Sequence, residues 1–363
     1  MSGRVAVFTR PMEPMEFREY PLPEVGQNDI LVKVRCSNIC GSDLHIWHGH
    51  GPKFPSDVQF VPGHEMMGQI FRMGSGVRTD CLGRPLEEGD RIAYSYFLPC
   101  GSCPACLSGS PACPNRARRW FRDANESPHF RGAYGDYYYL PQGQTVCKIP
   151  AELADTVVSP VNCALSQSIY GLHEIGVQLG DTVLIQGAGG LGLYAAAIAK
   201  DMGAGSVIVF DRFADRLEMA IEFGADVTVN IDEVGEADRR QLVFDSTRGR
   251  GADVVAEFVG SPQAVTEGVQ LLRQNGRYLW VGNITPGRPS QLDPGTVVRG
   301  AHIIRGIIAY EPWVLPRAID FLERRGHRYP FHKIVSHSFP VPDINQAFSF
   351  ADEGKAIRVS LQM

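Results

Sequence analysis

The feature that most limits the possible folds is a regular alternation in the second half of the chain. Apolar runs of strand length occur in the order DTVLIQGAGG, SVIVFD, VTVNI, DVVAEFVG, GRYLWVG and HIIRGIIAY. Between them lie helix-like stretches such as LGLYAAAIAKDMG, RLEMAIEFG and AVTEGVQLLRQNG. Continuously apolar strands are buried on both faces, and interleaved helices cover them. We therefore predict an α/β domain with a doubly wound parallel sheet over residues 165–309.

The first part of the chain has a different pattern. Residues 1–164 contain short β-like runs separated by Gly and Pro, including ILVKVRC, DRIAYSYF, GDYYYL and TVCKIP, which predicts an irregular β domain. From about Tyr310 the alternation ends, and PWVLPRAIDFLERRG reads as one more helix before short strands. A chain of 363 residues usually exceeds one hydrophobic core. We expect two domains, the first of them completed by residues 310–363.

Charge and hydropathy exclude several classes of partner. A formal net charge of -5 gives no overall attraction to nucleic acid or to anionic lipid. The N-terminal stretch MSGRVAVFTRPMEPM lacks the apolar segment of a signal peptide, and no apolar run is long enough to span a bilayer. We expect a cytoplasmic protein without nucleic-acid or membrane partners, in a compartment where thiols stay reduced.

A glycine-rich turn follows the first apolar run of the second domain. Its residues are Gly187, Gly189, Gly190, Leu191 and Gly192. Such a turn allows close approach of the main chain to a pyrophosphate at the N-terminus of the following helix. The next run ends in Asp211, placed to accept hydrogen bonds from both ribose hydroxyls. This carboxylate would repel a 2′-phosphate, which favours NAD(H), whereas the neighbouring Arg212 is an argument for NADP(H).

Four of the nine cysteines lie in the loop CGSCPACLSGSPAC, at positions 100, 103, 106 and 113. Zinc takes four thiolates tetrahedrally, and two-residue gaps let the chain wrap around such an ion. A redox pair would need only two cysteines, and disulfides do not suit a reducing compartment. We predict that Cys100, Cys103, Cys106 and Cys113 bind a structural zinc, with all four positions filled by protein.

Other residues with metal-binding or acid–base chemistry are scattered. They are Cys40, Ser42, Asp43 and His45 in CGSDLH, His64 and Glu65 in PGHE, and Asn162 and Cys163 in SPVNC. Taken singly, each of these residues is usually an ordinary core or surface side chain. Their separations along the chain carry no mechanical meaning.

Together these motifs resemble the zinc-dependent medium-chain dehydrogenases, the family of alcohol, sorbitol and threonine dehydrogenases. The likeness extends from ILVKVRCSNICGSDLH through GHE, the four-cysteine loop and GAGGLG to GKAIRVSLQM. It implies a GroES-like β catalytic domain, made of residues 1–164 and 310–363, and a Rossmann dinucleotide-binding domain over 165–309. The active site would lie in the cleft between them.

The resemblance also assigns a catalytic zinc, the second of two per chain. Its ligands would be Cys40, His64 and Cys163, and substrate oxygen or water would complete the set. Two thiolates, a neutral imidazole and Zn²⁺ sum to no net charge, so an alcohol can lose its proton near neutral pH. Asp43 matches the carboxylate that orients the histidine ligand, and Glu65 matches the acidic neighbour of that histidine.

Proton transfer and cofactor contact complete the implied site. Ser42 matches the hydroxyl that passes on the substrate proton, His45 the histidine that carries it to solvent, and Arg358 an arginine on the cofactor pyrophosphate. Two departures are Gly41, where some members have a basic residue, and a last cysteine gap of six residues rather than seven.

The function implied is hydride transfer between NAD(H) and a small alcohol or carbonyl substrate, taking a primary or secondary alcohol to an aldehyde or ketone, in a homodimer or homotetramer. Oxidation of a polyol or hydroxy-amino acid is an alternative, and an inert zinc-stabilised binding protein is another. A nucleic-acid role for the basic segment RARRWFRD is a third. Trp47, Trp120 and Phe121 are candidates for apolar pocket walls, whereas Arg118 would favour an anionic substrate.

Overall fold

The computed structural model describes residues 1–50, 58–282 and 286–363, and all of the predicted site residues lie in these ranges. The chain divides into two compact units. The first consists of residues 1–166, 311–326 and 331–363, and the second of residues 167–310 and 327–330. The expected boundaries were at 164 and 310.

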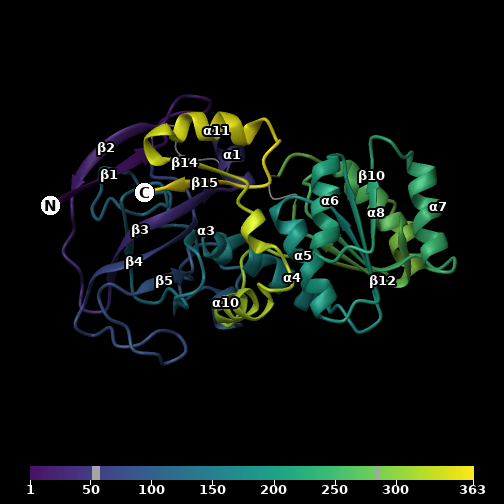
Figure 1. Ribbon diagram of the computed structural model, residues 1–363, viewed down its shortest axis with the longest axis horizontal. Helices are drawn as coiled ribbons and strands as arrows, with labels where there is room; N and C mark the ends of the chain where they lie inside the picture. Colours follow the sequence, from purple (N-terminus) through teal and green to yellow (C-terminus); the bar gives the residue numbers. More distant parts are fainter. Residues whose placement is uncertain (51–57, 283–285) are drawn as a thin grey trace. The chain divides into compact units, whose positions relative to one another are not determined.

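The second unit is built on a parallel sheet (Figure 1). Across the described sheet the strands are β10 (Val227–Asn230), β9 (Ser206–Asp211), β8 (Thr182–Gln186), β11 (Ala252–Glu257), β12 (Leu272–Trp280) and β13 (Ile303–Gly306). Each pair of neighbours is parallel. In chain order this is 3-2-1-4-5-6, the arrangement of the Rossmann fold. The strand order reverses between β8 and β11, and ligands bind such sheets at the carboxyl ends of the strands beside this point.

Helices connect these strands and cover the sheet. They are α4 (Ser166–Ile175), α5 (Gly190–Asp201), α6 (Ala214–Glu222), α7 (Glu236–Ser246), α8 (Pro262–Gln270) and α9 (Pro294–Gly300). On one face, Leu184 and Ile208 of the sheet pack with Val243 of α7 and Val265 of α8. Strand residues that alternate with these, such as Val207, are also fully buried. Burial of both faces explains why the strands read as continuous apolar runs.

One predicted element has the wrong extent. The stretch AVTEGVQLLRQNG, residues 264–276, was expected to be helical, but α8 ends at Gln270 and β12 begins at Leu272. Leu272 pairs with Ala252 of β11, and Asn275 has a φ of 57°, which an α-helix does not accommodate. Leu271 therefore caps the helix and Leu272 begins the strand, a distinction that apolar periodicity cannot make over so short a run.

The first unit contains a mainly antiparallel sheet. Its described order is β14 (His337–Pro340), β15 (Val359–Gln362), β3 (Ile30–Ile39), β4 (Glu65–Met73), β5 (Arg91–Tyr94) and β7 (Val146–Lys148), and β6 (Tyr137–Leu140) pairs with β3. A separate hairpin-like pair is formed by β1 (Ser2–Val7) and β2 (Glu16–Pro21). In Figure 1 the C-terminal strand β15 lies beside β3, which comes from the first forty residues of the chain. The last segment of the chain thus completes the first unit.

The helices of the first unit are short, apart from two near the C-terminus. They are α1 (Gly41–Trp47), α2 (Pro104–Leu107), α3 (Asp155–Val158), the π-helix η1 (Val161–Leu165), α10 (Val314–Arg325), the 3₁₀ turns η2 (Phe331–Lys333) and η3 (Val341–Asp343), and α11 (Ile344–Asp352). The expected helix PWVLPRAIDFLERRG corresponds to α10, whose Leu315, Ile319 and Leu322 are buried.

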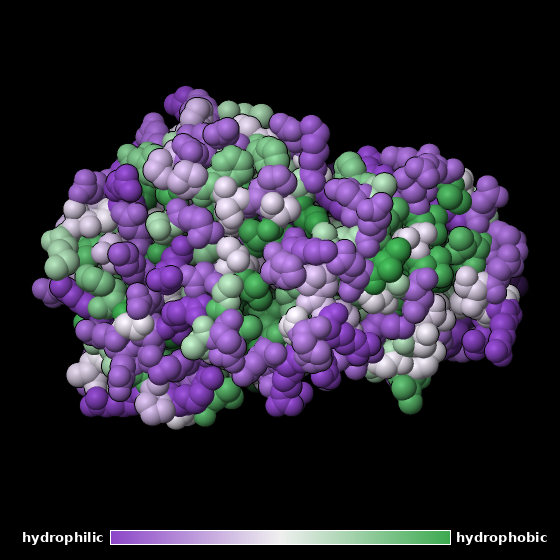
Figure 2. Space-filling view, in the orientation of Figure 1, coloured by the Kyte–Doolittle hydropathy of each residue, from purple (hydrophilic) through white to green (hydrophobic). Residues whose placement is uncertain are grey.

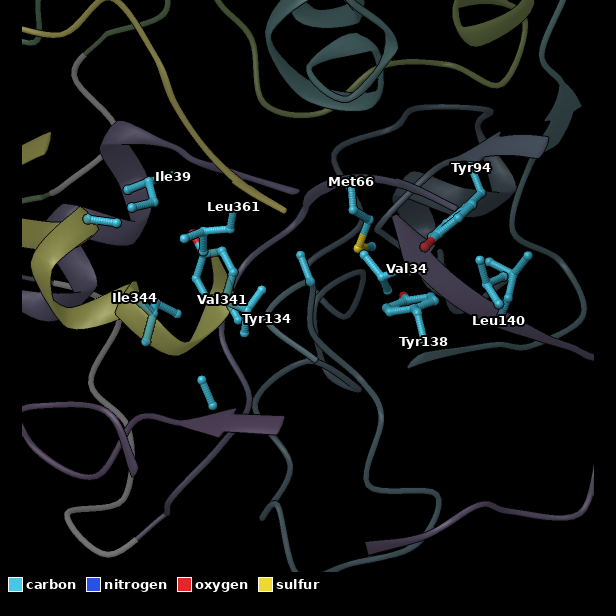
Figure 3. Close-up of a cluster of buried hydrophobic side chains, with 14 of the residues drawn as sticks. Val34, Ile39, Met66, Tyr94, Tyr134, Tyr138, Leu140, Val341, Ile344 and Leu361 are labelled. Carbon is cyan, nitrogen blue, oxygen red and sulfur yellow. The ribbon is translucent and has the colours of Figure 1, made fainter. Parts of the chain in front are cut away.

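The core of the first unit joins distant parts of the sequence (Figure 3). Tyr94 and Tyr138 stack with ring centroids 5.1 Å apart. Val341 and Ile344 from the C-terminal segment pack in the same cluster as Tyr134. Burying side chains of this size contributes about 1.5–3 kcal/mol each. This core fixes the strands and helices that carry the site described below.

The outer surface is mixed. Hydrophilic residues cover most of the face shown in Figure 2, with smaller groups of hydrophobic residues between them. Within the described ranges, none of the helices combines the length and the apolar character that a bilayer-crossing segment requires.

Candidate functional site

Cys40 lies at the N-cap of α1, directly after β3. Asp43, three residues later, accepts a hydrogen bond from the main-chain N–H of Cys40, with a distance of 2.9 Å. This reciprocal arrangement is a capping box in which a thiol stands where Ser or Thr is usual. The CGSDLH motif therefore begins the helix and fixes the Cys40 side chain at the same time.

Asp43 also reaches His64, which directly precedes β4. The Oδ1 atom of Asp43 lies 3.2 Å from Nδ1 of His64, and its Oδ2 atom accepts a hydrogen bond from the Tyr134 hydroxyl at 2.9 Å. A neutral imidazole that donates from Nδ1 to this carboxylate has the lone pair of Nε2 available for a metal. The side chains of Asp43 and His64 are at most 3% exposed, so this orientation is held within the core.

Cys163 is in the π-helix η1, which packs against β4, β5 and α10. A π turn is rare and frequently marks a functional site. Next to it, the Asn162 side-chain amide donates to the main-chain oxygens of His64 and Tyr94, each at 3.0 Å. The Nδ2 atom of Asn162, a further potential ligand in the sequence, thus ties η1 to the strands that carry the other site residues.

These segments bring four potential ligands into one cluster, hereafter the buried cage. One side-chain atom from each of Cys40, His64, Glu65 and Cys163 lies within 4.8 Å of the others, and all four residues are buried. Sγ of Cys163 is 3.3 Å from Nε2 of His64. Tetrahedral zinc, at its usual bond lengths, separates a sulfur and a nitrogen ligand by about 3.6 Å. The donor set and the spacing both fit zinc.

The thiols of the buried cage titrate together. The neighbouring Cys163 lowers the pKa of Cys40 well below its usual value, against the effect of burial, and in turn Cys40 raises the pKa of Cys163. A cation in the cage favours a second thiolate, because its charge opposes the repulsion between the sulfurs.

Glu65, the fourth residue of the buried cage, is paired with an arginine. Its Oε2 accepts a hydrogen bond from Nη1 of Arg358, and both side chains are buried. Burial raises the pKa of Glu65 to about 8, although Arg358 opposes this shift. Its other oxygen, Oε1, has no hydrogen-bond partner among the described residues. The family resemblance predicts that Arg358 contacts the cofactor pyrophosphate. In this structure its guanidinium is already hydrogen-bonded to Glu65.

Two aromatic side chains surround His64. The ring of Tyr96 is 4.7 Å from the imidazole and that of Trp120 is 4.9 Å from it, measured between centroids. Phe121 stacks on Trp120 at 5.3 Å. Trp47 lies elsewhere, against Phe348 of the core. Of the three proposed pocket walls, the structure places Trp120 directly at the buried cage.

Ser42 and His45 lie on α1, two positions after Cys40 and two after Asp43 respectively. Both side chains are partly exposed, whereas Asp43 between them is buried. His45 has a ring contact with His50 at 6.3 Å. One side of the helix therefore faces the buried cage and an adjacent side reaches towards solvent, which a route for protons requires.

The four-cysteine loop forms a second cluster, hereafter the loop cage. The Sγ atoms are 3.5 Å apart for Cys103 and Cys106, 3.7 Å for Cys103 and Cys113, 3.6 Å for Cys113 and Cys100, and 4.0 Å for Cys100 and Cys106. Tetrahedral zinc with four thiolates separates the sulfurs by about 3.8 Å. The main-chain N–H groups of Cys100 and Cys106 point at sulfur, which is the wrapping expected from two-residue gaps.

The glycine turn joins β8 to α5 in the second unit. Gly187 has a φ of +100°, which favours glycine, and a Cβ on Gly192 would lie 1.7 Å from the Gly187 oxygen. Gly189 is the N-cap of α5, and a Cβ there would meet nothing within 4 Å. Gly190 and Leu191 form the first turn of the helix. The turn therefore has the tight reversal, the open approach and the close packing needed to hold a pyrophosphate.

Asp211 ends β9 and is tied to this turn. Its Oδ2 accepts a hydrogen bond from Ala188 N at 2.6 Å, and its Oδ1 accepts from the amides of Arg212 and Phe213 at 2.8 and 3.0 Å. These amides fix the carboxylate beside the glycine turn. The Arg212 side chain is mostly exposed and lies 4.0 Å from Asp232.

Sequence reasoning missed three contributions to the buried cage. Tyr134 holds Asp43, Tyr96 lies against His64, and Arg358 donates a hydrogen bond to Glu65. Tyr134 is 91 positions from Asp43, and Arg358 is 293 from Glu65. No local spacing signals such pairs, since they depend on how the sheet brings the chain together.

Comparison with known families gives two matches that cover most of the chain. Residues 26–151 match the alcohol dehydrogenase GroES-like domain, and residues 190–324 match the zinc-binding dehydrogenase domain. The first match includes Cys40, His64 and the loop cage. The second begins within the glycine turn.

Individual relatives are similar along nearly their whole length. The chain is 29% identical to 5-exo-hydroxycamphor dehydrogenase of Pseudomonas putida, over 95% of this chain and 94% of that protein. It is 31% identical to L-threonine 3-dehydrogenase of Saccharopolyspora erythraea, over 99% and 98%.

Solved structures give the same picture. An alcohol dehydrogenase of Thermotoga maritima, 30% identical, superposes with a TM-score of 0.93 over 100% of this chain and 99% of that one. A protein of Sinorhizobium meliloti described as a zinc-binding dehydrogenase and solved with NADP bound is 26% identical, with a TM-score of 0.86 over 100% of both chains.

Proposed function

Since the chain belongs to the zinc-dependent medium-chain dehydrogenase family and is an alcohol-type oxidoreductase, we propose that it oxidises an apolar secondary alcohol to a ketone, and catalyses the reverse reaction, with NAD(H). The observation that carries this proposal is the buried cage, in which a second thiol, an imidazole and a carboxylate surround Cys40.

The chemistry needs a Lewis acid at the substrate oxygen and a hydride acceptor, which zinc and NAD supply when bound. Cys40, His64 and Cys163 would hold the metal. The two thiolates would balance the charge of the ion, and the ion would supply stabilisation of negative charge on the substrate oxygen. Asp43 keeps Nε2 of His64 directed at the cage. Burial excludes water from these groups and strengthens each charge interaction.

Ser42 and His45 would move the proton. Ser42 takes it from the substrate hydroxyl, and His45, partly exposed on α1, passes it to solvent. Glu65 stays beside the metal ligands, where Arg358 donates a hydrogen bond to it. We assign Arg358 this second role in addition to the contact with pyrophosphate expected from the family.

The aromatic rings beside His64 support an apolar substrate. Tyr96 and Trp120 both lie within 5 Å of its imidazole, centroid to centroid, and such rings bury hydrocarbon surface well. This favours an alcohol of the kind named for the camphor relative over the amino acid named for the threonine relatives. A screen of bicyclic and aromatic secondary alcohols, polyols and L-threonine tests it. Preference for L-threonine would reject the apolar assignment while leaving the reaction type intact.

We also propose two zinc ions per chain, one in each cage. The four Sγ distances of the loop cage support the structural ion. Metal analysis of purified protein should give about two equivalents of zinc per chain. A value of one equivalent would contradict the proposal of two ions. If that equivalent were retained after the loop cysteines are replaced, the single ion would belong to the buried cage.

Asp211 supports NAD over NADP, even though the Sinorhizobium meliloti neighbour was solved with NADP. Its carboxylate, held by three main-chain amides, would repel a 2′-phosphate. Asp211→Ala should reduce the NAD/NADP ratio of kcat/KM by about tenfold or more. Asp226→Ala is the matched control, because Asp226 accepts a hydrogen bond from the main-chain N–H of Val207 in the same sheet. An unchanged ratio in Asp211→Ala would show that another group reads the ribose.

An assembly of two or four copies is supported by β13. This strand ends the described order of the parallel sheet, and Ile303 on it and Val298 on α9 are 57% and 77% exposed. Exposed apolar residues at a sheet edge indicate association with another chain. Sedimentation at micromolar concentration would give the dimer or tetramer mass, and a monomer would contradict the proposal.

A further inference from the structure

Two cysteines outside both cages lie side by side. The Sγ atoms of Cys81 and Cys147 are 2.7 Å apart, although the residues are 66 positions apart in the sequence. Both thiols are free in this structure. Cys81 is on the loop between β4 and β5, and Cys147 is the central residue of β7. Neither residue belongs to the machinery assigned above.

The main chain holds the two thiols together. Cys81 N donates to the oxygen of Val146 at 2.8 Å, and Lys148 N donates to Oδ2 of Asp80 at 3.0 Å. Arg84 adds a hydrogen bond to the oxygen of Lys148 at 2.6 Å. These contacts flank the cysteines on both sides, so their proximity does not depend on a flexible side-chain position.

The two thiols differ in access. Cys81 is exposed and Cys147 is buried. Cys81 also lines an open groove of about 1010 Å³, together with Leu82, Val146 and residues of α10. The pairing with Cys147 lowers the pKa of Cys81 against the effect of burial, and the same pairing raises the pKa of Cys147. This is the arrangement of an attacking thiol next to a resolving one.

We propose that Cys81 and Cys147 form a reversible disulfide by exchange with a low-molecular-weight disulfide of the glutathione type. The Cys81 thiolate attacks one sulfur of that disulfide, whose S–S bond breaks and releases one thiolate. Cys147 then loses its proton and attacks Sγ of Cys81, forming the protein disulfide and releasing the second thiolate. Two protein thiols are oxidised, one small disulfide is reduced, and the two protons end on the released thiols.

The cross-link would enclose a segment that carries several parts of the proposed site. Between Cys81 and Cys147 lie the loop cage, β5 and β6, and Trp120 at the buried cage. A disulfide across so long a loop restricts the unfolded chain strongly. The oxidised protein should therefore melt higher than the reduced one, by about 5 °C or more. The disulfide would thus stabilise this part of the first unit under oxidising conditions.

The test equilibrates zinc-replete wild-type protein in buffers of increasing oxidised-to-reduced glutathione ratio, followed by acid quench, alkylation and peptide mapping. The expected result is a peptide that joins Cys81 to Cys147, together with the rise in Tm. In Cys81→Ser the cross-linked peptide and the rise in Tm should both be absent, while turnover stays unchanged. Cys36→Ser should retain both, because Cys36 is a buried thiol outside the pair.

Three results would overturn the proposal. The first is a stable glutathione adduct on Cys81 without a cross-link. The second is two alkylatable thiols at the most oxidising ratio, and the third is a cross-link that joins Cys81 to another cysteine. Because the mapping is done on wild-type protein, failure of a variant to fold does not prevent a decision.

Discussion

The molecule has two sulfur-rich cages that are constructed in opposite ways. The loop cage takes all of its residues from fourteen consecutive positions, and only Cys113 of the four is buried. The buried cage takes Cys40, His64 and Cys163 from segments 24 and 99 positions apart, and each is buried in the first unit. One is a local structure of the chain, and the other is assembled by the whole domain.

Because of this difference, we expect a metal in the loop cage to affect mainly the stability of the protein and a metal in the buried cage to affect mainly the reaction. The loop cage has little hydrophobic core of its own, since α2 inside it contains no buried residue. A metal there would supply the stability that local packing does not. The buried cage already has its geometry from β3, β4 and η1, so a metal there adds reactivity to a preorganised site. Removing a ligand from each cage should therefore affect different properties.

The largest expected effect is on turnover. Cys163→Ser replaces a thiolate ligand with a weak hydroxyl ligand of similar size, so zinc should fall by about one equivalent and kcat/KM by roughly 10³-fold or more. NAD affinity should stay close to wild type, because the glycine turn belongs to the second unit. Metal analysis, steady-state kinetics and nucleotide titration measure the three quantities. Turnover near wild type would remove Cys163 from the ligand set.

The reciprocal change is expected in the loop cage. Cys103→Ser should also lower zinc by about one equivalent, but its main effect should be a Tm lower by about 5 °C or more. At temperatures well below that Tm, kcat should stay within about threefold of wild type, since the sulfur partners of Cys103 are Cys106 and Cys113 of the same loop. A loss of turnover as large as that of Cys163→Ser at low temperature would make the two cages functionally inseparable.

The same contrast explains what the sequence can predict. The spacing of four nearby cysteines predicts the loop cage, and the alternation of apolar runs with helical stretches predicts the Rossmann sheet. Local sequence pattern is therefore sufficient for both. Cys40 and Cys163 come together only through the sheet and a π turn, and here the resemblance to a family supplied what spacing could not. Tyr134 had no signal of either kind. The end of α8 at Gln270 was misjudged because two leucines suit a helix face and a buried strand equally.

A smaller effect is expected from the groups that support the buried cage. Asp43→Asn removes the negative charge beside Nδ1 of His64 and should lower zinc affinity or kcat/KM by about 10- to 100-fold. Asp29→Asn is the matched control, because Asp29 also accepts a hydrogen bond from a tyrosine hydroxyl, that of Tyr139 at 2.6 Å, away from the cage. Equal activity in the two variants would mean that the orientation of His64 does not depend on Asp43.

The smallest effect should come from the corresponding support in the loop cage. The Ser102 main-chain amide, followed by the Asn115 side chain, lowers the pKa of Cys100 to about 5, and the Asn115 amide donates to Cys100 Sγ at 3.5 Å. A metal is bound by the thiolate, so acid releases it as Cys100 is protonated. Asn115→Ala should raise that pKa, move zinc release to a higher pH and weaken binding by roughly fivefold or less. A pH titration of zinc release with a chromogenic chelator measures the shift, and Asn125→Ala, in a loop without metal ligands, should leave it unchanged. Solvent can replace one hydrogen bond at an exposed sulfur but not at a buried imidazole. Zinc binding should therefore weaken less in Asn115→Ala than in Asp43→Asn, and the opposite order would contradict the proposed difference between the two cages.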